Sequence, residues 1–336
     1  MSEKKSKPEK NIGNSLQDLG KFLQDKDSKQ NEEFSKDIYK KNQCESQSNF
    51  GYFFYKDFYL NDNGESIFID NSKKIDKYLS EKSEKFLELK FNPKTASFTK
   101  ELQNLSKYTI KYFTLQTTYP GLLIGSGYIH ETGNEGEFKL GFFFDFSTGL
   151  PIIPGSSVKG VLRSAFSHSD YISSQLKQVI KDKEFDINVK FIKQLESNIF
   201  ENEELINKGD YKETKENKYK NPYKRDIFFD AIPCSIKNTK TENGNENILF
   251  AEDFITPHKD PLKNPIPLKF LKIKSCVEFK FFFKLSDTVI RIGLEDYIFS
   301  SEDKIKLFEN IILDIGIGAK TNVGYGVFEQ NKILKK

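Results

Sequence analysis

The sequence predicts an α+β fold in which helices cover one face of an antiparallel sheet. From residue 108 onward, segments with strand-like alternation and segments with helical spacing follow in the order strand, helix, strand, strand, helix, strand. This order is the split βαβ pattern of ferredoxin-like folds. Two polar interruptions, at residues 201–224 and 234–267, are long for connections of a compact domain, so we expect large insertions carried on its loops.

The composition predicts a water-soluble protein with one large domain or two small ones. Of 336 residues, 37% are hydrophobic and 30% are charged, and no apolar run approaches the roughly 20 residues that a membrane-spanning helix needs. The first ten residues are too charged for a signal peptide, so we expect a cytoplasmic protein. The net charge of +3 does not by itself indicate a polyanionic partner, and nucleic acid would require basic groups gathered on one surface.

The cysteine pattern indicates neither a metal site nor a disulfide. Cys44, Cys234 and Cys276 are far apart and lack the paired spacing of a zinc module. Free thiols are the simplest state in a reducing compartment. We therefore expect no metal and no cofactor.

Composition divides the chain into three regions. Residues 1–50 are rich in Lys, Glu, Gln and Asn, and we expect an arm that is flexible or ordered by a partner. Residues 51–107 are expected to pack as an extension on the core, and residues 108–336 to form the ferredoxin-like domain. An aromatic run at residues 50–60 predicts a strand or a packing element, and residues 72–90 have the apolar spacing of a helix.

The ferredoxin-like domain has recognisable elements of both kinds. Strands are expected at residues 109–119, 138–146, 225–233 and 276–285, and helices after a cap at residues 156–157, at 170–182, at 186–199 and at 302–316. A glycine-rich loop and a last strand follow. The insertion at residues 201–224 has few core-forming side chains and predicts a mobile surface segment. The excursion at residues 234–267 combines turn residues with several prolines and predicts a protruding hairpin.

The segment PIIPGSSVKGVLR, residues 151–163, predicts a helix start that can bind an anion. Ser156 and Ser157 lie where the helix would have its N-cap, and Lys159 and Arg163 are four residues apart on one helical face. Unpaired N–H groups, hydroxyls and two cations are suitable partners for a phosphate. The alternative is an ordinary capped helix with an exposed basic pair.

The glycine-rich loop at residues 316–326 is a second candidate phosphate site. Its glycines allow positive φ angles, so that backbone N–H groups can surround a phosphate beside a lysine. The loop matches neither the Walker A motif nor the Rossmann motif, which argues against nucleotide-hydrolysing and dinucleotide-dependent enzymes. Tyr325 would either stack on a base or pack over the helix end. The candidate residues are Gly316, Gly318, Lys320, Thr321, Asn322, Gly324 and Tyr325.

Three further polar residues have candidate roles. His130 is next to Glu131, and such a pair beside RNA could act as general acid and base without a metal, although a lone loop histidine is more often inert. His258 is expected to brace the base of the excursion. Asp230, at a strand end, is expected to cap a neighbouring turn rather than to be catalytic.

Several separated motifs resemble those of a known family. GLPIIPGSSVKGVLR and the terminal GIGAKTNVGYG, with FFDAIP and the TPH of residues 256–258 between them, resemble the RAMP superfamily of CRISPR proteins. The order GSG, PGSSVKG, FFDAIP, TPH, GAKTNVGYG is similar to that of the sixth subunits of Cmr (type III-B) effector complexes. The resemblance covers residues 108–330, and the first hundred residues take no part in it.

The resemblance implies a non-catalytic subunit with an RRM-like ferredoxin fold that binds guide RNA. Such a subunit holds the 3′ portion of the guide at one end of a filament, in a complex with backbone, small and terminal subunits and with target RNA. The nuclease is expected in the backbone subunit, and part of residues 234–267 would form a thumb that wedges into the guide–target duplex. The RNA-binding residues implied are Ser156, Ser157, Lys159, Arg163, Gly316, Gly318, Lys320, Thr321, Asn322, Gly324, Tyr325 and His258.

Two other functions stay open at this point. Related ferredoxin-like CRISPR endoribonucleases process precursor guide RNA, and His130 would be the general acid or base of such an enzyme. A purely protein–protein scaffold is the third possibility, with the N-terminal arm and residues 201–224 docking neighbouring subunits.

Overall fold

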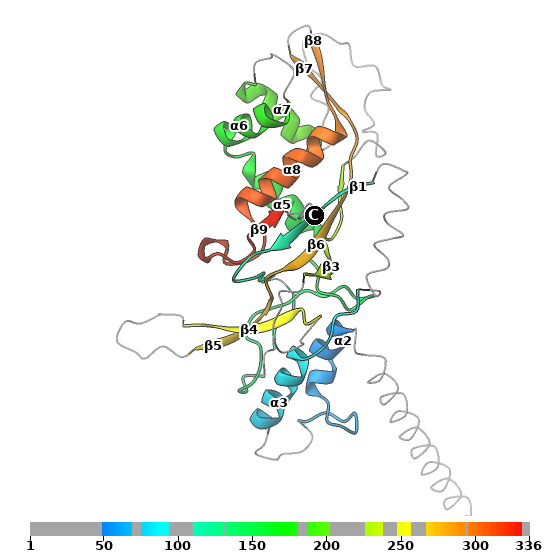
Figure 1. Ribbon diagram of the computed structural model, residues 1–336, viewed down its shortest axis with the longest axis vertical. Helices are drawn as coiled ribbons and strands as arrows, with labels where there is room; N and C mark the ends of the chain where they lie inside the picture. Colours follow the sequence, from blue (N-terminus) through cyan, green and yellow to red (C-terminus); the bar gives the residue numbers. More distant parts are fainter. Residues whose placement is uncertain are drawn as a thin grey trace, which may run out of the picture.

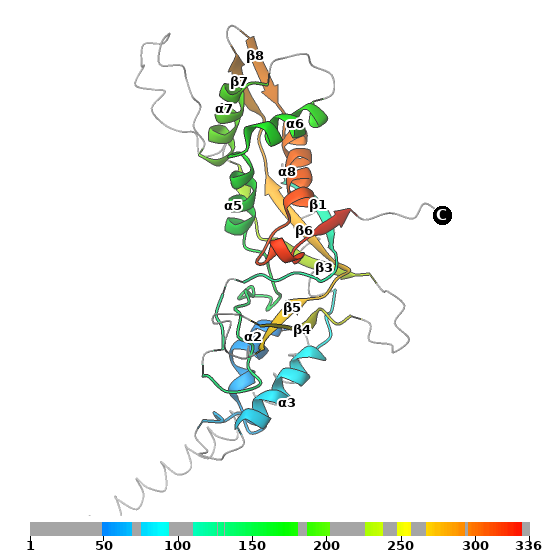
Figure 2. The same cartoon turned by 90° about the vertical axis from the view of Figure 1, so that its left-hand side faces the viewer.

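A computed structural model describes residues 49–68, 75–93, 110–125, 127–130, 132–180, 187–201, 226–237, 247–256, 267–292 and 295–330. Figures 1 and 2 show an elongated molecule, with a sheet covered by helices toward one end and a smaller, helix-containing part at the other. One hydrophobic cluster includes buried side chains from both parts. The two parts therefore share a core.

The first part, which we call the sheet half, contains a five-stranded antiparallel sheet among the described residues. Its strands are β1 (Ile110–Thr117), β2 (Ile227–Phe228), β3 (Ile232–Ile236), β6 (Val277–Lys284) and β9 (Phe328–Gln330). β6 lies between β1 on one side and β2 and β3 on the other, and β9 pairs with the second edge of β1. The predicted α+β class is confirmed.

Helices cover one face of this sheet, as Figures 1 and 2 show. They are α5 (Gly155–Ala165), α6 (Ser169–Val179), α7 (Val189–Phe200) and α8 (Ser301–Ile315), which also belong to the sheet half. α6, α7 and α8 agree with the helices predicted at residues 170–182, 186–199 and 302–316. α8 packs directly on the sheet, where the rings of Phe308 and Phe283 lie 5.5 Å apart.

The start of α8 is fixed by two local interactions. Ser300 and Asp303 form a capping box, in which the side chain of each accepts the backbone N–H of the other. One residue further on, Lys304 Nζ lies 2.6 Å from Asp226 Oδ2, and both side chains are buried. Asp226 immediately precedes β2 and also accepts the N–H of Ser286, after β6, at 2.9 Å. This buried pair therefore joins α8 to the edge of the sheet.

The second part, which we call the aromatic half, has a core made mainly of rings. It consists of α2 (Phe50–Tyr55), the short 3-10 helix η2 (Asp57–Tyr59), α3 (Ile75–Leu87), the irregular segment 132–150, and the hairpin of β4 (Phe250–Ile255) and β5 (Leu268–Ile273). The aromatic run is a helix here, because Phe50, Phe53 and Phe54 are three and four residues apart and reach the core together. α3 agrees with the helix predicted at residues 72–90.

The strand predicted at residues 138–146 is wrong. Around this segment the structure has only isolated bridges, Tyr128 to Phe142 and Phe144 to Pro151. Phe142 and Phe144 are buried, with ring centres 5.5 and 6.1 Å from Phe250 of β4. The apolar run therefore reflects packing against rings of other elements, and periodicity alone does not distinguish this from a buried strand.

Two hairpins extend beyond the main sheet. β4 and β5 pair antiparallel from Phe250 opposite Ile273 to Ile255 opposite Leu268. This hairpin begins inside the predicted excursion at residues 234–267, but the first residues of that excursion belong to the sheet as β3. The second hairpin, β7 (Thr288–Ile292) and β8 (Glu295–Phe299), continues from β6 and has no counterpart in the predicted elements.

Some predictions concern residues outside the described ranges. They are the arm up to residue 48, with Cys44, most of the insertion at residues 201–224, and the segment between β4 and β5 that contains His258. In the part of the chain that the structure describes, no helix is both long enough and apolar enough to cross a lipid bilayer.

Candidate nucleic-acid interface

The glycine-rich loop forms a tight turn that is docked on residues 121–123. Ala319 donates its N–H to Leu123 O at 2.7 Å, and Gly326 donates its N–H to Gly121 O at 2.8 Å. The two ends of the turn are joined by a bond from Ile317 N–H to Gly326 O at 2.9 Å. Gly326 has φ +70°, and a Cβ there would lie 2.0 Å from Ile317 O, so only glycine fits. We call residues 316–326 the glycine turn.

The tip of the glycine turn faces solvent. Lys320 has φ +59°, in the left-handed region, and leads into the short 3-10 helix η7 (Thr321–Val323). Asn322 and Val323 are exposed, and Lys320 and Thr321 are half-exposed. A cation, a hydroxyl and an amide are therefore presented together on a strongly bent backbone, an arrangement suited to the phosphate groups of a nucleic acid.

Tyr325 is turned away from this tip. Its ring is 8% exposed and packs with Leu123 and Phe270. Its hydroxyl donates to Asp253 Oδ2 on β4 at 2.7 Å, and burial together with this hydrogen bond raises the pKa of Tyr325. The ring has no open face for a base, so the packing alternative describes Tyr325, although it packs on the β4–β5 hairpin rather than over a helix end.

The start of α5 differs from the predicted serine cap. The N-cap is Pro154, whose carbonyl accepts the N–H groups of Ser157 at 2.8 Å and Val158 at 3.0 Å, so both serines already lie inside the first turn. The N–H of Gly155 donates to Asp230 Oδ1 at 2.7 Å. A carboxylate from the loop between β2 and β3 therefore occupies the position predicted for an anion. The expectation that Asp230 caps a neighbouring segment is confirmed.

Lys159 and Arg163 do lie on one face of α5, but that face meets the end of α7. Lys159 Nζ donates to Phe200 O at 2.9 Å, and Arg163 pairs with Glu196 at 3.5 Å and with Glu201. Cations at the C-terminal end of a helix are stabilised by its dipole. Both charges therefore have a structural role within the helical layer, while Ser156 remains exposed at the helix start.

The two predicted contact segments lie in the same region of the molecule. In both ribbon views the start of α5 and the glycine turn are found at the end of the helical layer nearer the aromatic half (Figures 1 and 2). Ser156 and Asn322 are exposed on these segments. His258, the remaining candidate, lies outside the described residues.

His130 is part of the aromatic core. It is 3% exposed, and its ring lies 4.1 Å from the rings of both Phe54 and Phe58. Nε2 donates to Phe54 O at 3.0 Å, and Nδ1 accepts the N–H of Phe138 at 3.4 Å, a pattern that needs the neutral ring. Burial lowers the pKa of His130 to about 4. The catalytic alternative for His130 is wrong, because a substrate cannot reach either nitrogen.

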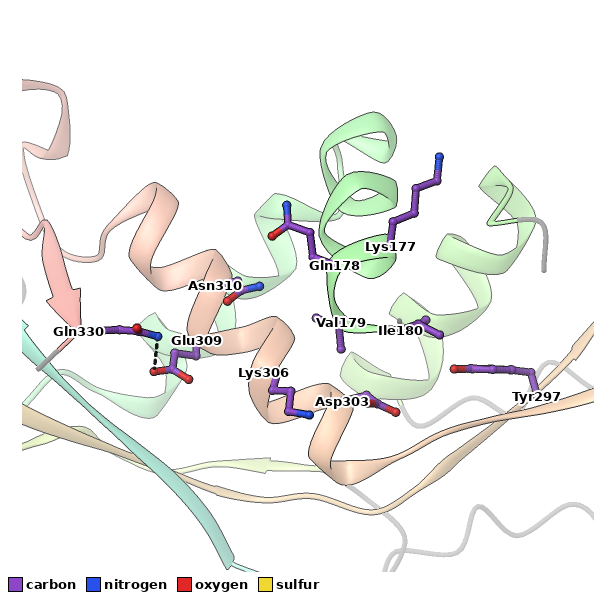
Figure 3. A pocket seen from close by; sticks show the side chains of 10 residues that line it. All are labelled: Lys177, Gln178, Val179, Ile180, Tyr297, Asp303, Lys306, Glu309, Asn310 and Gln330. Carbon is purple, nitrogen blue, oxygen red and sulfur yellow. Dashed lines mark hydrogen bonds between the residues drawn. The ribbon is translucent and has the colours of Figure 1, made fainter. Parts of the chain in front are cut away.

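A groove lies on the helical layer, and the sequence did not point to it. It has a volume of about 820 Å³ and lies between the end of α6, α8 and strands β8 and β9 (Figure 3). Its polar side chains carry both signs: Lys177 and Lys306 are cationic, and Asp303 and Glu309 are acidic. None of the predicted site residues lines it. Among the described residues there is also no group of His, Cys, Asp and Glu side chains that could hold a metal ion.

Comparison with known proteins places the fold in a family. A family model described as the RAMP superfamily matches residues 114–329. The "CRISPR system CMR subunit Cmr6" of Saccharolobus solfataricus is 30% identical over 239 residues, which are 70% of this chain and 62% of that protein, so the chain spans less than two thirds of this relative.

Two solved structures are also similar. One chain of "Cryo-EM structure of the Type III-B Cmr-beta bound to cognate target RNA" is 24% identical, with a TM-score of 0.47 over 87% of this chain and 94% of the other. "Crystal structure of Cmr6 from Pyrococcus furiosus" is 18% identical, with a TM-score of 0.33 over 66% and 98%. The family match runs from within β1 to within β9, so it includes residues of all five strands of the main sheet together with both candidate contact segments. The chain therefore belongs to the RAMP superfamily.

Proposed function

We propose that the chain is a non-catalytic, guide-RNA-binding subunit of a type III-B CRISPR (Cmr) effector complex. It would hold the 3′ portion of the guide at one end of the filament and contact the backbone subunits. The observation that carries this proposal is the 30% identity, over 239 residues, to a protein described as a Cmr6 subunit. The strand order β2–β6–β1–β9, with antiparallel neighbours throughout, supports a ferredoxin-like arrangement.

The glycine turn is the principal RNA contact in this proposal. Lys320, Thr321 and Asn322 would bind the sugar-phosphate chain, and Gly316, Gly318 and Gly324 would shape the backbone around it. Such contacts position a strand without reading its bases, which suits a subunit that must accept any guide.

The start of α5 is the second contact. Ser156 and Ser157 would meet the same strand, whereas Lys159 and Arg163 are engaged by α7 and would contribute mainly through their long-range charge. Asp230 would oppose a phosphate at the first turn of α5. We therefore expect the glycine turn to contribute more binding free energy than the helix start.

The β4–β5 hairpin is the proposed thumb. It protrudes from the body in Figure 1, and the segment between its strands contains His258. The bond from Tyr325 to Asp253 joins the base of this hairpin to the glycine turn. Guide binding at the turn and the wedge at the guide–target duplex would thus be adjacent.

A salt series on the assembled complex tests the proposal. Guide RNA should copurify with the tagged chain, and Lys320→Ala should weaken RNA binding and reduce the slope of log K against log salt by about 1, as expected for one phosphate contact. Lys306→Ala removes the same charge from an exposed position in the groove of Figure 3 and serves as the control. Equal slopes for the two variants would contradict the proposal, and specific cleavage of precursor guide RNA by the purified chain would indicate the endoribonuclease instead.

A scaffold function is the second candidate, and the β7–β8 hairpin favours it. Val289 and Ile298 lie directly opposite each other on this hairpin and are 53% and 55% exposed. An apolar cross-strand pair on a projecting element is suited to a protein partner. Retention of the chain in the complex after RNase treatment, combined with loss of retention in Val289→Ser/Ile298→Ser, would support this role.

A further inference from the structure

Residues 118–122 lie between the glycine turn and the turn that connects β5 to β6. On one side Thr118 donates its N–H to Val327 O at 3.0 Å, just after the glycine turn. On the other side Leu122 donates its N–H to Ile273 O at 2.9 Å, at the end of β5. The segment is therefore held in place by backbone hydrogen bonds at both edges.

Tyr119 is the exception within this well-packed segment. Its side chain is 87% exposed, whereas Gly121 and Leu122, immediately after it, are buried. Pro120, the next residue along, lies beside the glycine turn, since a Cβ added to Gly324 would lie 3.4 Å from Pro120 Cδ. The Tyr119 ring therefore contributes little to the stability of the core. The backbone of Tyr119 is nevertheless held beside the proposed phosphate site.

The two turns that flank residues 118–122 carry polar and cationic side chains. Lys320 and Asn322 of the glycine turn provide a cation and an amide, and Val323 is 67% exposed beside them. Lys274 follows Ile273 in the turn on the opposite side of the segment. Proteins that hold single-stranded nucleic acid combine such cations with aromatic rings on which bases stack.

We propose that Tyr119 is the stacking platform for a base of the bound single-stranded RNA, whose phosphate is held at the glycine turn. This inference rests on the proposed function and adds to it the residue that takes the role predicted for Tyr325. Stacking accepts any of the four bases, so the contact is compatible with a guide of arbitrary sequence.

The other strongly exposed aromatic residues of the described chain are less suitable. Tyr128 is 79% exposed and has its ring against Tyr55 in an edge contact of 5.9 Å. Phe146 is fully exposed, but it lies in the turn at residues 145–149, which is bonded to the start of α2 through Gly149 O and Gly51 N–H. Tyr128 pairs with Phe142, and the turn of Phe146 is bonded to α2, so both residues belong to the aromatic half and not to the glycine turn. Phe146 is therefore a suitable control.

Binding of oligouridine RNA to the full-length chain is the first test. Tyr119→Ala should weaken binding by about 5- to 150-fold, the range for loss of one stacked base, and Tyr119→Phe should bind as the unchanged protein does. The slope of log K against log salt should be the same in the two Tyr119 variants as in the unchanged protein, because no phosphate contact is removed. Phe146→Ala should leave the affinity unchanged.

A spectroscopic test uses the absence of tryptophan from the sequence. Tyr119→Trp introduces a single indole, whose fluorescence should be quenched when a base stacks on it. Phe146→Trp places the same reporter at the control position, and its emission should not respond to oligouridine.

The outcomes separate this inference from the proposed function. If Lys320→Ala weakens binding while Tyr119→Ala does not and the Tyr119→Trp emission is unchanged, the stacking role is overturned and the RNA-binding function stands. If the unchanged chain does not bind oligouridine even at low salt, both are overturned. Weaker binding of Tyr119→Ala with rescue by Tyr119→Phe supports both.

Discussion

His130 illustrates how a single buried residue sets a pH dependence. Burial lowers its pKa to about 4, whereas an unfolded chain would have a histidine pKa of 6.5. The unfolded state takes up the proton first as the pH falls, so the stability due to neutral His130 is complete above about pH 6.5. It is lost between about pH 6.5 and about pH 4.

We therefore expect the free energy of unfolding to drop by about 2 to 3 kcal/mol between pH 7 and about pH 4.5 because of this one group. Urea unfolding across this range measures the drop. His130→Gln should remove that part of the slope, while His168→Gln, at an exposed position, should retain it. Parallel profiles for the unchanged protein and His130→Gln would refute the assignment.

Tyr325 is the second residue whose role is defined by one contact. Its hydroxyl donates to Asp253, which also binds Lys272 Nζ at 2.5 Å. Partial burial would raise the pKa of Asp253, but the hydrogen bonds from Lys272 and Tyr325 outweigh it and lower that pKa. The tyrosine thus helps to hold a charged carboxylate at the base of the hairpin.

Tyr325→Phe should destabilise the fold by about 1 to 2 kcal/mol, because it removes a hydrogen bond to a charged group and leaves the ring in place. Tyr119→Phe loses the same hydroxyl from an exposed side chain and should change the stability by less than about 0.5 kcal/mol. Thermal or urea unfolding of the two variants makes the comparison. Equal stabilities would show that the bond to Asp253 contributes nothing.

At the scale of the element, α5 combines a capped start with a basic face. Asp230 accepts the first N–H of the helix and carries a negative charge at the place where a phosphate would bind. The cap and a bound anion therefore compete for the same partial positive charge.

Asp230→Asn tests this competition, because the amide oxygen can keep the hydrogen bond while the charge is lost. On the proposed function we expect RNA to bind about 2- to 5-fold more tightly at low salt, the effect of removing one charge near a helix end. Asp170→Asn makes the same charge change at an exposed position on α6 and should have no effect. An unchanged affinity for Asp230→Asn would show that no phosphate lies at the start of α5.

At the scale of the whole molecule, the buried pair of Lys304 and Asp226 joins α8, β2 and the end of β6. Both side chains are 1% exposed, so neither charge can be compensated by water if its partner is removed. Desolvation raises the pKa of Asp226 and lowers that of Lys304, and their mutual attraction opposes both changes.

Lys304→Met should therefore cost about 3 to 5 kcal/mol of unfolding free energy. Lys306→Met, two residues further along α8 and exposed, should change it by less than about 0.5 kcal/mol. The double variant Lys304→Met/Asp226→Leu should recover part of the loss, since no lone charge is left. The unfolding free energies are measured by chemical denaturation. Equal values for Lys304→Met and Lys306→Met would contradict a structural role for the pair of Lys304 and Asp226.

The sequence predicted the main elements of the sheet half because their signals are local. β6 has an apolar run within one strand, and α8 carries its own capping box and apolar spacing. The segment 138–146 was assigned to the wrong structure, and the aromatic run, predicted as a strand or a packing element, is a helix that packs into the core. In both cases the burial comes from rings supplied by distant parts of the chain, such as Phe250. Local periodicity contains no information about these partners.

The candidate site follows the same rule. The glycine turn was recognised from its composition, and the helix after the Ser156–Ser157 pair was predicted, although it begins two or three residues earlier than that cap implies, at Gly155. The orientation of individual side chains was not predictable, because it depends on partners far away in the sequence. Arg163 is held by Glu201, 38 positions away, and Tyr325 is held by Asp253, 72 positions away. Tyr119 was missed because its exposure is visible only once the neighbouring residues are seen to be buried.

The β4–β5 hairpin is held from two sides. Toward α3, Lys269 Nζ donates to Ser83 Oγ at 2.8 Å, and toward the glycine turn, Asp253 accepts from Tyr325. The paired strands of the hairpin therefore connect α3 to the glycine turn. On the proposed function, a movement of the hairpin strands would act on residues 316–326 and on α3 together, which would couple the proposed thumb to the proposed RNA contact.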